Sequence, residues 1–230
     1  MNKTANQMSE SIWVGMVLAL SGGFMDAYSY ICRDEVFANA QTGNILLFGV
    51  NLVERNFAVA LRYLCPVLAF TIGIIVADFI RFKVRPERQI HWRQIVVLIE
   101  AVILFGVAFI QKGYSLPANT LISLACGIQV ESFRTIKGNG IATTMCIGNL
   151  RSGTQNLCEY IISKDNKYIR KCALYYGIIF CFAIGAIVGS VFIKCINERA
   201  ILICSVLLMI AFLMMYKGNN EFAKNGQVEK

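Results

Sequence analysis

The sequence predicts an all-α protein: a polytopic transmembrane helix bundle of two inverted repeats, with about six spans plus two broken or re-entrant helices. Three observations predict this fold. Hydrophobic residues make up 57% of the 230 residues and charged residues only 16%, whereas soluble domains have roughly 45–50% and 25%. The apolar residues form runs of membrane-spanning length, and the two halves of the chain resemble each other. The composition therefore implies a lipid bilayer as the main partner.

Several apolar runs are long enough to cross a membrane, which takes about 20 residues in a helix. A soluble core helix would instead show a polar stripe at every turn. The runs leave no room for a separate soluble domain. We therefore expect a multi-pass membrane protein with spans at residues 12–31, 61–80, 94–111, 117–133, 172–193 and 200–216.

The positive charge of the chain is interpreted as a topology signal. The formal net charge is +8, but Lys and Arg are concentrated in short loops between apolar runs, as at the cytoplasmic faces of membrane proteins. We therefore predict no nucleic-acid partner. The nine cysteines are scattered without a Cys-x-x-Cys pair, and His91 is the one histidine, so no metal site and no cofactor are predicted.

An internal repeat relates the two halves. Residues 70–78 align with residues 182–190 at an offset of 112, with five of nine positions identical. Residues 22–44 align with residues 127–149 at an offset of 105 and keep a glycine, an acid and a Gly-Asn pair. Transporter folds are commonly built by such duplication. The predicted units are a first membrane repeat at 1–113, a second membrane repeat at 114–218 and a polar cytoplasmic tail at 219–230.

The distribution of basic residues indicates that the second repeat is inverted. Loop 81–93 has five Lys or Arg residues and its counterpart 194–199 has two, whereas stretch 52–62 has two and its counterpart 151–171 has five. Loops rich in Lys and Arg stay in the cytoplasm. The positive loop thus changes position between the copies, which predicts antiparallel repeats with both termini cytoplasmic.

Inversion requires an odd number of crossings in each half. Each half has a fourth apolar segment, 36–53 in the first and 140–162 in the second, and these two are the most polar and glycine-interrupted. We interpret them as re-entrant or broken helices, which leaves three spans per half. The alternative is eight spans with parallel repeats.

Two acids within apolar segments occupy equivalent positions in the repeat. Asp26 and Glu131 are related by the offset of 105, which would place both carboxylates near a pseudo-two-fold axis. An ionisable group at membrane depth costs about 2.5–3.5 kcal/mol on insertion scales and therefore commonly faces a polar path. We interpret the pair as a proton- or cation-binding site at the repeat interface. The alternative is that both lie near span ends, where Glu131 pairs with Arg134.

Two further acids have different surroundings. Asp78 is expected to pair with Arg81 one turn along its helix. Glu100 lies in the middle of an apolar segment without a basic neighbour, and its counterpart in the second repeat is Ser205. Any role of Glu100 is therefore predicted to be confined to the first half.

The two broken segments carry clusters of polar residues. Glycine lets a helix unwind, and the freed carbonyl groups together with an asparagine amide coordinate ions or polar substrates in transporters. The alternative is that these side chains form interhelical hydrogen bonds. The candidate substrate- or ion-binding residues, besides Asp26 and Glu131, are Asn39, Thr42, Gly43 and Asn44 in the first segment and Thr144, Gly148 and Asn149 in the second.

Small residues four apart mark two expected helix-packing faces. Gly73-x-x-x-Ala77 in the first half and Gly185-x-x-x-Gly189 in the second are counterparts at the offset of 112. Small side chains at this spacing let helix backbones approach closely. We predict a structural role for both.

Three stretches resemble the YoaK-like family of bacterial membrane proteins. They are Gly22-Gly-Phe-Met-Asp-Ala-Tyr-Ser-Tyr30, Val36-Phe-Ala-Asn-Ala-Gln-Thr-Gly-Asn44 and Ala142-Thr-Thr-Met-Cys-Ile-Gly-Asn-Leu150. The chain departs from the family pattern at Ile147, where members carry threonine, and at Glu131, in a stretch that is usually of Gln-Asn-Ala type. The family is functionally uncharacterised, so the resemblance implies a multi-pass protein of the bacterial inner (plasma) membrane and names no substrate.

The predicted function is that of a small secondary transporter or channel-like protein. Duplication, inversion and intramembrane polar residues recur in transporters. The expected partners are an unknown small molecule or ion and a second copy of the chain, which would help to enclose a pathway. The alternative is a non-transporting membrane scaffold or sensor that acts through protein partners. A membrane-embedded enzyme ranks third. No enzyme activity is predicted, because the sequence shows no recognisable arrangement of a nucleophile and a base.

Overall fold

The computed structural model describes residues 11–84 and 91–228, with side chains described up to residue 217. Its helices are α1 (Ile12–Cys32), α2 (Gln41–Val53), α3 (Phe57–Lys83), α4 (Trp92–Val107), α5 (Ser115–Ser132), α6 (Cys146–Ser163), α7 (Asn166–Ile196) and α8 (Leu202–Val228), with a 3₁₀ helix, η3 (Asn197–Ile201), before α8. A short antiparallel hairpin of β1 (Thr135–Ile136) and β2 (Asn139–Gly140) precedes α6. The predicted helical fold class is confirmed for these residues. Arg85 and Arg88 of the predicted basic loop lie outside them.

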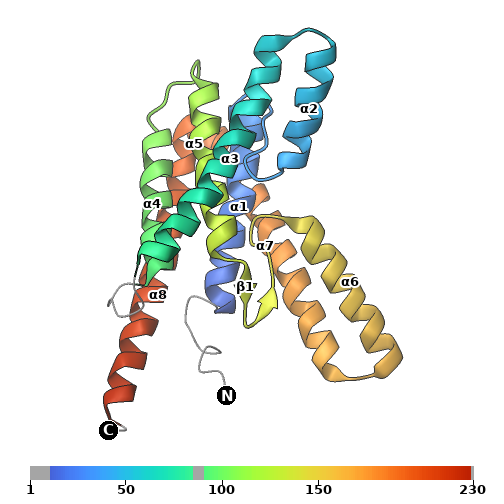
Figure 1. The fold of residues 1–230 in the computed structure, drawn as a ribbon, viewed down its shortest axis with the longest axis vertical. Helices are drawn as coiled ribbons and strands as arrows, with labels where there is room; N and C mark the ends of the chain where they lie inside the picture. The colour runs from blue at the N-terminus through green and yellow to red at the C-terminus, as the bar shows by residue number, and fades with distance from the viewer. Residues whose placement is uncertain (1–10, 85–90, 229–230) are drawn as a thin grey trace.

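The long helices run along the bundle in alternating directions (Figure 1). Helices α1, α4 and α7 point one way, and α3, α5 and α8 point the other way. We call the end where α1 begins, drawn at the bottom of Figure 1, the lower end, and the opposite end the upper end. Helix α8 also finishes at the lower end, and the predicted polar tail is helical as far as Val228.

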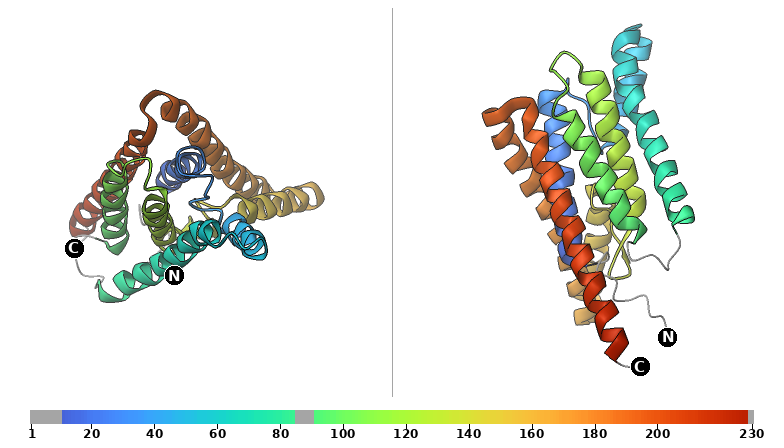
Figure 2. Two further views of the ribbon diagram at one scale, coloured as in Figure 1. Left: turned by 90° about the horizontal axis from the view of Figure 1, so that it is seen from above. Right: turned by 90° about the vertical axis from the view of Figure 1, so that its left-hand side faces the viewer.

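Helices α2 and α6 begin near the middle of the bundle and run to opposite ends (Figures 1 and 2). Helix α2 returns to the upper end and forms a hairpin with α3, whereas α6 runs to the lower end and forms a hairpin with α7. With 13 residues, α2 is about 20 Å long, short of the roughly 30 Å hydrocarbon core. Both segments expected to be broken thus contain a helix that starts near the middle of the bundle.

Three helical stretches among the described residues are long and apolar enough to cross a membrane. They are Ile12–Cys32, Phe57–Lys83 and Asn166–Lys217. The third stretch includes two antiparallel helices, α7 and α8 (Figure 1). Helix α4, with 16 residues, falls short of that length. Each of the predicted spans coincides with one of the long helices, and the number of spans remains a prediction.

Glycines set the closest contacts between helices. A Cβ atom on Gly185 would overlap the carbonyl oxygen of Leu20, so α7 and α1 touch through their backbones. A Cβ atom on Gly73 would overlap the carbonyl oxygen of Leu124 in the same way, so α3 touches α5. The predicted packing role of the small residues is therefore confirmed. Since each half supplies one helix to each crossing, the halves are interleaved and are not separate domains.

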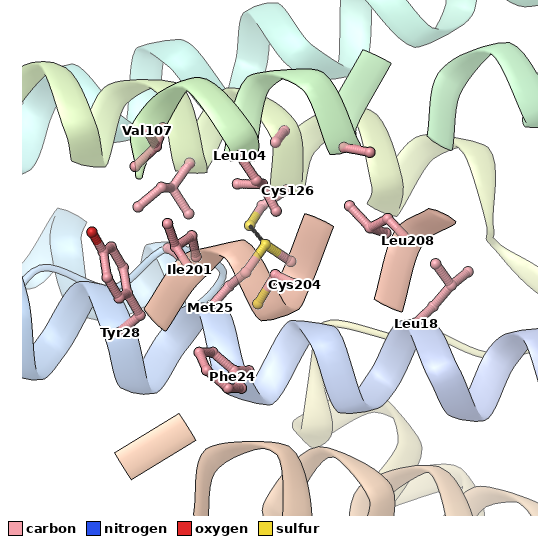
Figure 3. Packing of buried hydrophobic residues seen from close by; sticks show 14 of the residues in the cluster. Leu18, Phe24, Met25, Tyr28, Leu104, Val107, Cys126, Ile201, Cys204 and Leu208 are labelled. Carbon is pink, nitrogen blue, oxygen red and sulfur yellow. Dashed lines mark hydrogen bonds between the residues drawn. The ribbon is translucent and has the colours of Figure 1, made fainter. Parts of the chain in front are cut away.

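The apolar core lies where α1, α4, α5 and α8 meet (Figure 3). Two cysteines lie near its centre: the Cys126 thiol is 3.9 Å from Met25 Sδ, and the Cys204 thiol donates to the carbonyl oxygen of Ser21 at 3.8 Å. Both side chains are fully buried, and the cysteines are free thiols. They pack as small hydrophobic residues.

The outer surface carries many large apolar side chains. Along α3 they follow one another at helical spacing on the face away from α5, and Phe79 is 61% exposed. A soluble protein would not leave such a continuous face uncovered. This surface suits contact with lipid chains. The exposed apolar residues of α3 are Phe57, Leu61, Leu68, Ile72, Ile75, Phe79 and Phe82.

A fully buried arginine, Arg33, ties the upper end together. Its guanidinium donates to the Tyr28 hydroxyl at 2.9 Å and to the carbonyl oxygens of Ile110 and Gln111 at 2.7 and 3.0 Å. Its own carbonyl oxygen accepts from Asn119 Nδ2 at 2.6 Å. These bonds join the end of α1 to the α4–α5 loop and to α5. A buried guanidinium is tolerated when its donors are satisfied in this way.

Candidate functional site

An asparagine in the first turns of α2 and another in α6 each bond the irregular segment before the helix in the same way, and we call this arrangement the asparagine clamp. Asn44 Oδ1 accepts from the backbone N–H of Phe37 at 3.1 Å, and Asn44 Nδ2 donates to the carbonyl oxygen of Phe37 at 2.7 Å. Asn149 makes the same pair of bonds with Ala142, at 3.3 and 2.6 Å. Each clamp spans seven residues and satisfies a backbone amide where the chain turns back into the bundle. The interhelical alternative is wrong for these bonds, which are local, and the amides are engaged in folding rather than open to a ligand.

Asp26 lies against the irregular segment before α2. Its Oδ1 accepts from the backbone N–H of Asn39 at 2.8 Å. The Asn39 side chain donates to the carbonyl oxygen of Gly22, one turn earlier on α1, at 3.1 Å. The structure therefore brings together Asp26 and Asn39, two of the predicted site residues, on one face of α1.

The irregular segment before α6 reaches the same turn of α1. A Cβ atom on Gly22 would lie 3.3 Å from both Thr143 O and Thr144 Cγ2, so glycine allows this close approach. Gln129 Nε2, on α5, donates to Thr143 Oγ1 at 3.2 Å and to the carbonyl oxygen of Leu18 at 3.3 Å. We name Asp26, Asn39, Gln129, Thr143 and Thr144 the polar cluster.

Several oxygen atoms of the polar cluster have no hydrogen-bond partner among the described residues. They are Asn39 Oδ1, Gln129 Oε1 and Thr144 Oγ1, and all three residues are at most 2% exposed. Ser21 Oγ, next to Gly22 on α1, is also buried without a partner. Buried polar atoms normally have partners, so each exception calls for a ligand, an ion or water. Oxygen atoms of this kind are ligands for hard cations and accept hydrogen bonds.

Three of the predicted residues lie away from the polar cluster. Thr42 and Gly148 are exposed, and nothing lies within 4 Å of a Cβ atom on Gly148. Gly43 packs against the ring of Phe37. The glycines therefore do not unwind α2 or α6, because both lie inside regular helix. The unwound backbone precedes each helix instead.

Glu131 is not brought to Asp26. Where the helices cross, Gly23 of α1 contacts Phe182 of α7, and Gly127 of α5 contacts Phe70 of α3. Gly23 and Gly127 are therefore equivalent, and α1 corresponds to α5 at an offset of 104. Asp26 then corresponds to Val130, and Glu131 points about 100° away around the helix. The offset of 105 applies only beyond the helix ends, because α5 stops earlier than α1 and the segment after it is longer.

The side chain of Glu131 instead forms an ion pair at the lower end. Its Oε1 lies 3.2 Å from Arg134 Nη2, which confirms the predicted pairing at i, i+3. The predicted Asp78–Arg81 ion pair is also present, at 3.6 Å. The expected pair of carboxylates at a pseudo-two-fold axis is therefore replaced by one acid, Asp26, in a cluster of neutral polar side chains.

Gln129, Thr143 and Glu100 were not among the predicted site residues. Gln129 could have been identified from the sequence, because it is an uncharged polar residue within the apolar run 117–133. Glu100 is fully buried in α4, and neither carboxyl oxygen has a hydrogen-bond partner among the described residues. Its neighbours on α4, Val97 and Ala101, belong to the apolar core that also includes Met25 and Cys126. The described residues contain no group of three or more His, Cys, Asp or Glu side chains that would hold a metal ion.

Comparison with known proteins places these features in a family. Residues 14–214 match the family described as "Protein of unknown function (DUF1275)". The chain is 26% identical over 181 residues to the UPF0700 transmembrane protein YoaK of Bacillus subtilis (strain 168), covering 75% of this chain and 79% of the relative. No solved structure matches. The YoaK-like resemblance is thus confirmed, and the chain is a membrane protein that belongs to the DUF1275 family of unknown function.

Proposed function

We propose that this chain is a small secondary transporter or channel-like protein of the bacterial inner membrane, in which the polar cluster binds a proton or a cation. The observation that carries the proposal is the position of Asp26. Its carboxylate accepts from the backbone N–H of Asn39, whose side-chain Oδ1 is buried without a partner among the described residues. The segment before α6 meets α1 one turn away, at Gly22. Polar residues of this kind at membrane depth commonly mark ion pathways.

Inverted repeats are part of the proposal, and several equivalent contacts support them. The clamps of Asn44 and Asn149 are related by 105 residues, and so are Asn51 and Asn156, whose Nδ2 atoms donate to carbonyl oxygens four residues earlier at 2.8 Å. The helices of the second half point opposite to their counterparts in the first (Figure 1). Transporters place substrate sites near the midplane, where such repeats meet and helices are discontinuous.

The orientation in the membrane is likewise proposed from charge. The described ends of loop 81–93 and the 164–171 region both lie at the lower end in Figure 1. Basic loops remain cytoplasmic. We therefore assign the lower end, where α1 begins and α8 ends, to the cytoplasm. This orientation includes three membrane crossings in each half and places both termini in the cytoplasm.

A flux assay on purified protein in liposomes tests the proposal. Proton, Na⁺ and K⁺ entry would be followed with ion-sensitive dyes under an imposed membrane potential. Asp26→Asn keeps an oxygen that accepts from Asn39 but removes the charge, so we expect cation entry to fall to the level of empty liposomes. The matched control is Asp34→Asn, which removes an exposed carboxylate that pairs with Arg62 at 3.8 Å near the upper end; this variant should retain full flux.

The outcomes separate the proposal from its alternative. Wild-type flux in Asp26→Asn would remove Asp26 from the mechanism. Absence of entry for all three cations in wild-type liposomes would favour a scaffold or sensor that acts through protein partners. A second copy of the chain and the absence of enzyme activity stay predictions, and the mass of the detergent-solubilised protein tests the first of these.

A further inference from the structure

The irregular segments before α2 and α6 bring residues of both halves to one point on α1. Asn39 and Thr144 are 105 residues apart, as the two clamp asparagines are, and each lies five residues before its clamp asparagine. Asn39 Nδ2 donates to the carbonyl oxygen of Gly22 at 3.1 Å, and a Cβ atom on Gly22 would lie 3.3 Å from Thr144 Cγ2. Gly22 is the middle residue of α1, Ile12–Cys32. Corresponding residues of the two segments therefore meet halfway along a predicted membrane span.

Each of these two residues has a buried oxygen atom without a hydrogen-bond partner. Asn39 is 1% exposed and Thr144 is 2% exposed, and neither Asn39 Oδ1 nor Thr144 Oγ1 has a partner among the described residues. The contact with Gly22 fixes the orientation of the Asn39 amide, because a carbonyl oxygen only accepts and therefore requires the amide nitrogen. The amide oxygen is the atom left for a ligand. Two buried oxygen atoms on side chains that contact the same glycine thus call for a shared partner.

One negative charge accompanies these oxygen atoms. Asp26 lies one turn further along α1 than Gly22, and its Oδ1 accepts from the backbone N–H of Asn39 at 2.8 Å. It is the one acidic residue of the five in the polar cluster. The amide nitrogens of Asn39 and Gln129 already donate to protein oxygen atoms, so the unpartnered atoms of the cluster are all oxygens. Asp26 is partly exposed, whereas Asn39 and Thr144 are buried, so a ligand from outside meets the carboxylate first.

We propose that Asn39 Oδ1 and Thr144 Oγ1 bind one monovalent alkali cation, Na⁺ or K⁺, with Asp26 as its counter-charge. Hard cations are bound by oxygen ligands, and polar groups at interrupted helices coordinate Na⁺ in transporters. A single carboxylate balances one positive charge, whereas the affinity of Ca²⁺ sites depends on the number of charged ligands. This inference rests on the proposed function, because it names the cation that the polar cluster would carry.

A proton would use the same cluster in a different way. It would bind the carboxylate of Asp26 and would require no further oxygen ligand. An alkali cation instead requires several oxygen ligands at once. The contribution of Thr144 Oγ1 therefore distinguishes an alkali cation from a proton.

Thermal stability of the detergent-purified full-length protein tests the proposal, since a ligand that binds the folded state raises Tm with its concentration. The probes are the chlorides of Na⁺, K⁺ and Ca²⁺, titrated against choline chloride at constant ionic strength and pH. We expect Na⁺ or K⁺ to raise Tm in a saturable way, and the ion that acts at the lower concentration is the preferred one. Choline should have no effect, because it is too large for a site between packed helices.

Substitutions locate the effect at Thr144. Thr144→Val keeps the shape of the side chain and removes Oγ1, so we expect the apparent Kd of the responding cation to rise about tenfold. Thr144→Ser keeps the hydroxyl and should bind within about twofold of the wild type. The matched control is Thr120→Val, which removes a hydroxyl on α5 that donates to the carbonyl oxygen of Leu116 at 2.7 Å. This control should leave Kd unchanged.

The outcomes separate this inference from the proposed function. A Tm rise that is equal for Na⁺, K⁺ and choline, a stronger effect of Ca²⁺ than of either alkali cation, or an unchanged Kd in Thr144→Val would each overturn the site. If Thr144→Val does not fold, the wild-type titrations remain decisive. Proton entry in the flux assay without any Tm response to Na⁺ or K⁺ would refute the site and leave the proposed function in place. A saturable Tm response without ion flux would support the site and refute transport.

Discussion

Helices α2 and α6 occupy corresponding places in the two halves, and their backbones are held in the same way. Each follows an irregular segment that an asparagine, Asn44 or Asn149, fastens by both a donated and an accepted hydrogen bond. About two turns further on, Asn51 and Asn156 donate to the carbonyl oxygen four residues earlier. Equivalent local hydrogen bonds thus hold the backbones of the two helices.

The outward faces of the same helices differ. Most exposed residues of α2 are apolar, with Leu46 at 65% and Val50 at 44%. At the corresponding two positions α6 exposes Arg151 and Gln155, beside the exposed apolar residues Ile147 and Leu150. Apolar side chains suit lipid and polar side chains suit water or a headgroup region. One backbone arrangement is thus used twice, and the two copies differ in the side chains that they expose.

Removal of either clamp should have the largest effect on folding. Asn44→Ala and Asn149→Ala each leave a backbone N–H and a carbonyl group without their partner, at an expected cost of about 3 kcal/mol of unfolding free energy. Equal losses in the two variants are expected, because the clamps have the same geometry. Unfolding of the detergent-solubilised protein by denaturant, followed by circular dichroism, measures both.

Controls for the clamps lie on the same helices. Asn51→Ala and Asn156→Ala remove one bond to a carbonyl that the helix already satisfies, so we expect less than about 1 kcal/mol for each. If Asn149→Ala were no more harmful than Asn156→Ala, the clamp would not hold the second segment in place.

An exchange of outer residues tests the difference between the helices. Leu46→Arg places a charge on the apolar face of α2, and we expect it to cost about 2 kcal/mol of insertion free energy. Arg151→Leu makes the reverse change on α6 and is expected to be tolerated. The fraction of protein recovered folded from membranes measures both effects. Equal tolerance of the two changes would indicate that both helices face the same surroundings.

The sequence predicted the helical bundle and the two interrupted segments because hydropathy and glycine content report burial directly. It predicted Asp26 and Asn39 as site residues, and the structure places them together. It did not predict how Asn44 and Asn149 are used, since a clamp across seven residues depends on how the chain turns back. Arg33 was missed because a buried arginine satisfied by carbonyl groups has the same sequence pattern as an ordinary loop cation.

The position of Glu131 shows why repeat alignment alone was insufficient. The offset of 105 holds for the polar segments but was also applied to α1 and α5, whose offset is 104. The second half gains the extra residue between these elements, because α5 ends earlier than α1 and the segment with the β1–β2 hairpin is longer. One residue along a helix turns a side chain by about 100°. Helix crossings such as Gly23 with Phe182 fix the true correspondence, and they are visible only in three dimensions.

The smallest expected effect concerns how α3 and α7 begin. Asn56, before α3, makes no capping bond, whereas Asp165, before α7, accepts from the backbone N–H of Lys167 at 2.9 Å and pairs with its ammonium at 2.8 Å. The side-chain contact with Lys167 and, to a smaller extent, the backbone bond hold the pKa of Asp165 below its ordinary value. A carboxyl with a lowered folded pKa stabilises the protein above its unfolded pKa of about 3.9, and the benefit disappears as pH falls through the folded value.

Asp165→Asn keeps the capping oxygen and removes the charge, so it isolates this pH-dependent part. We expect a small Tm deficit relative to the wild type at pH 6 that shrinks as the pH falls from about 4 downward. Asn56→Ala, before α3, should show no such dependence, because its side chain does not titrate. A deficit in Asp165→Asn that stayed constant down to pH 2.5 would assign it to lost packing instead. The ion pair would then contribute nothing to the difference between α3 and α7.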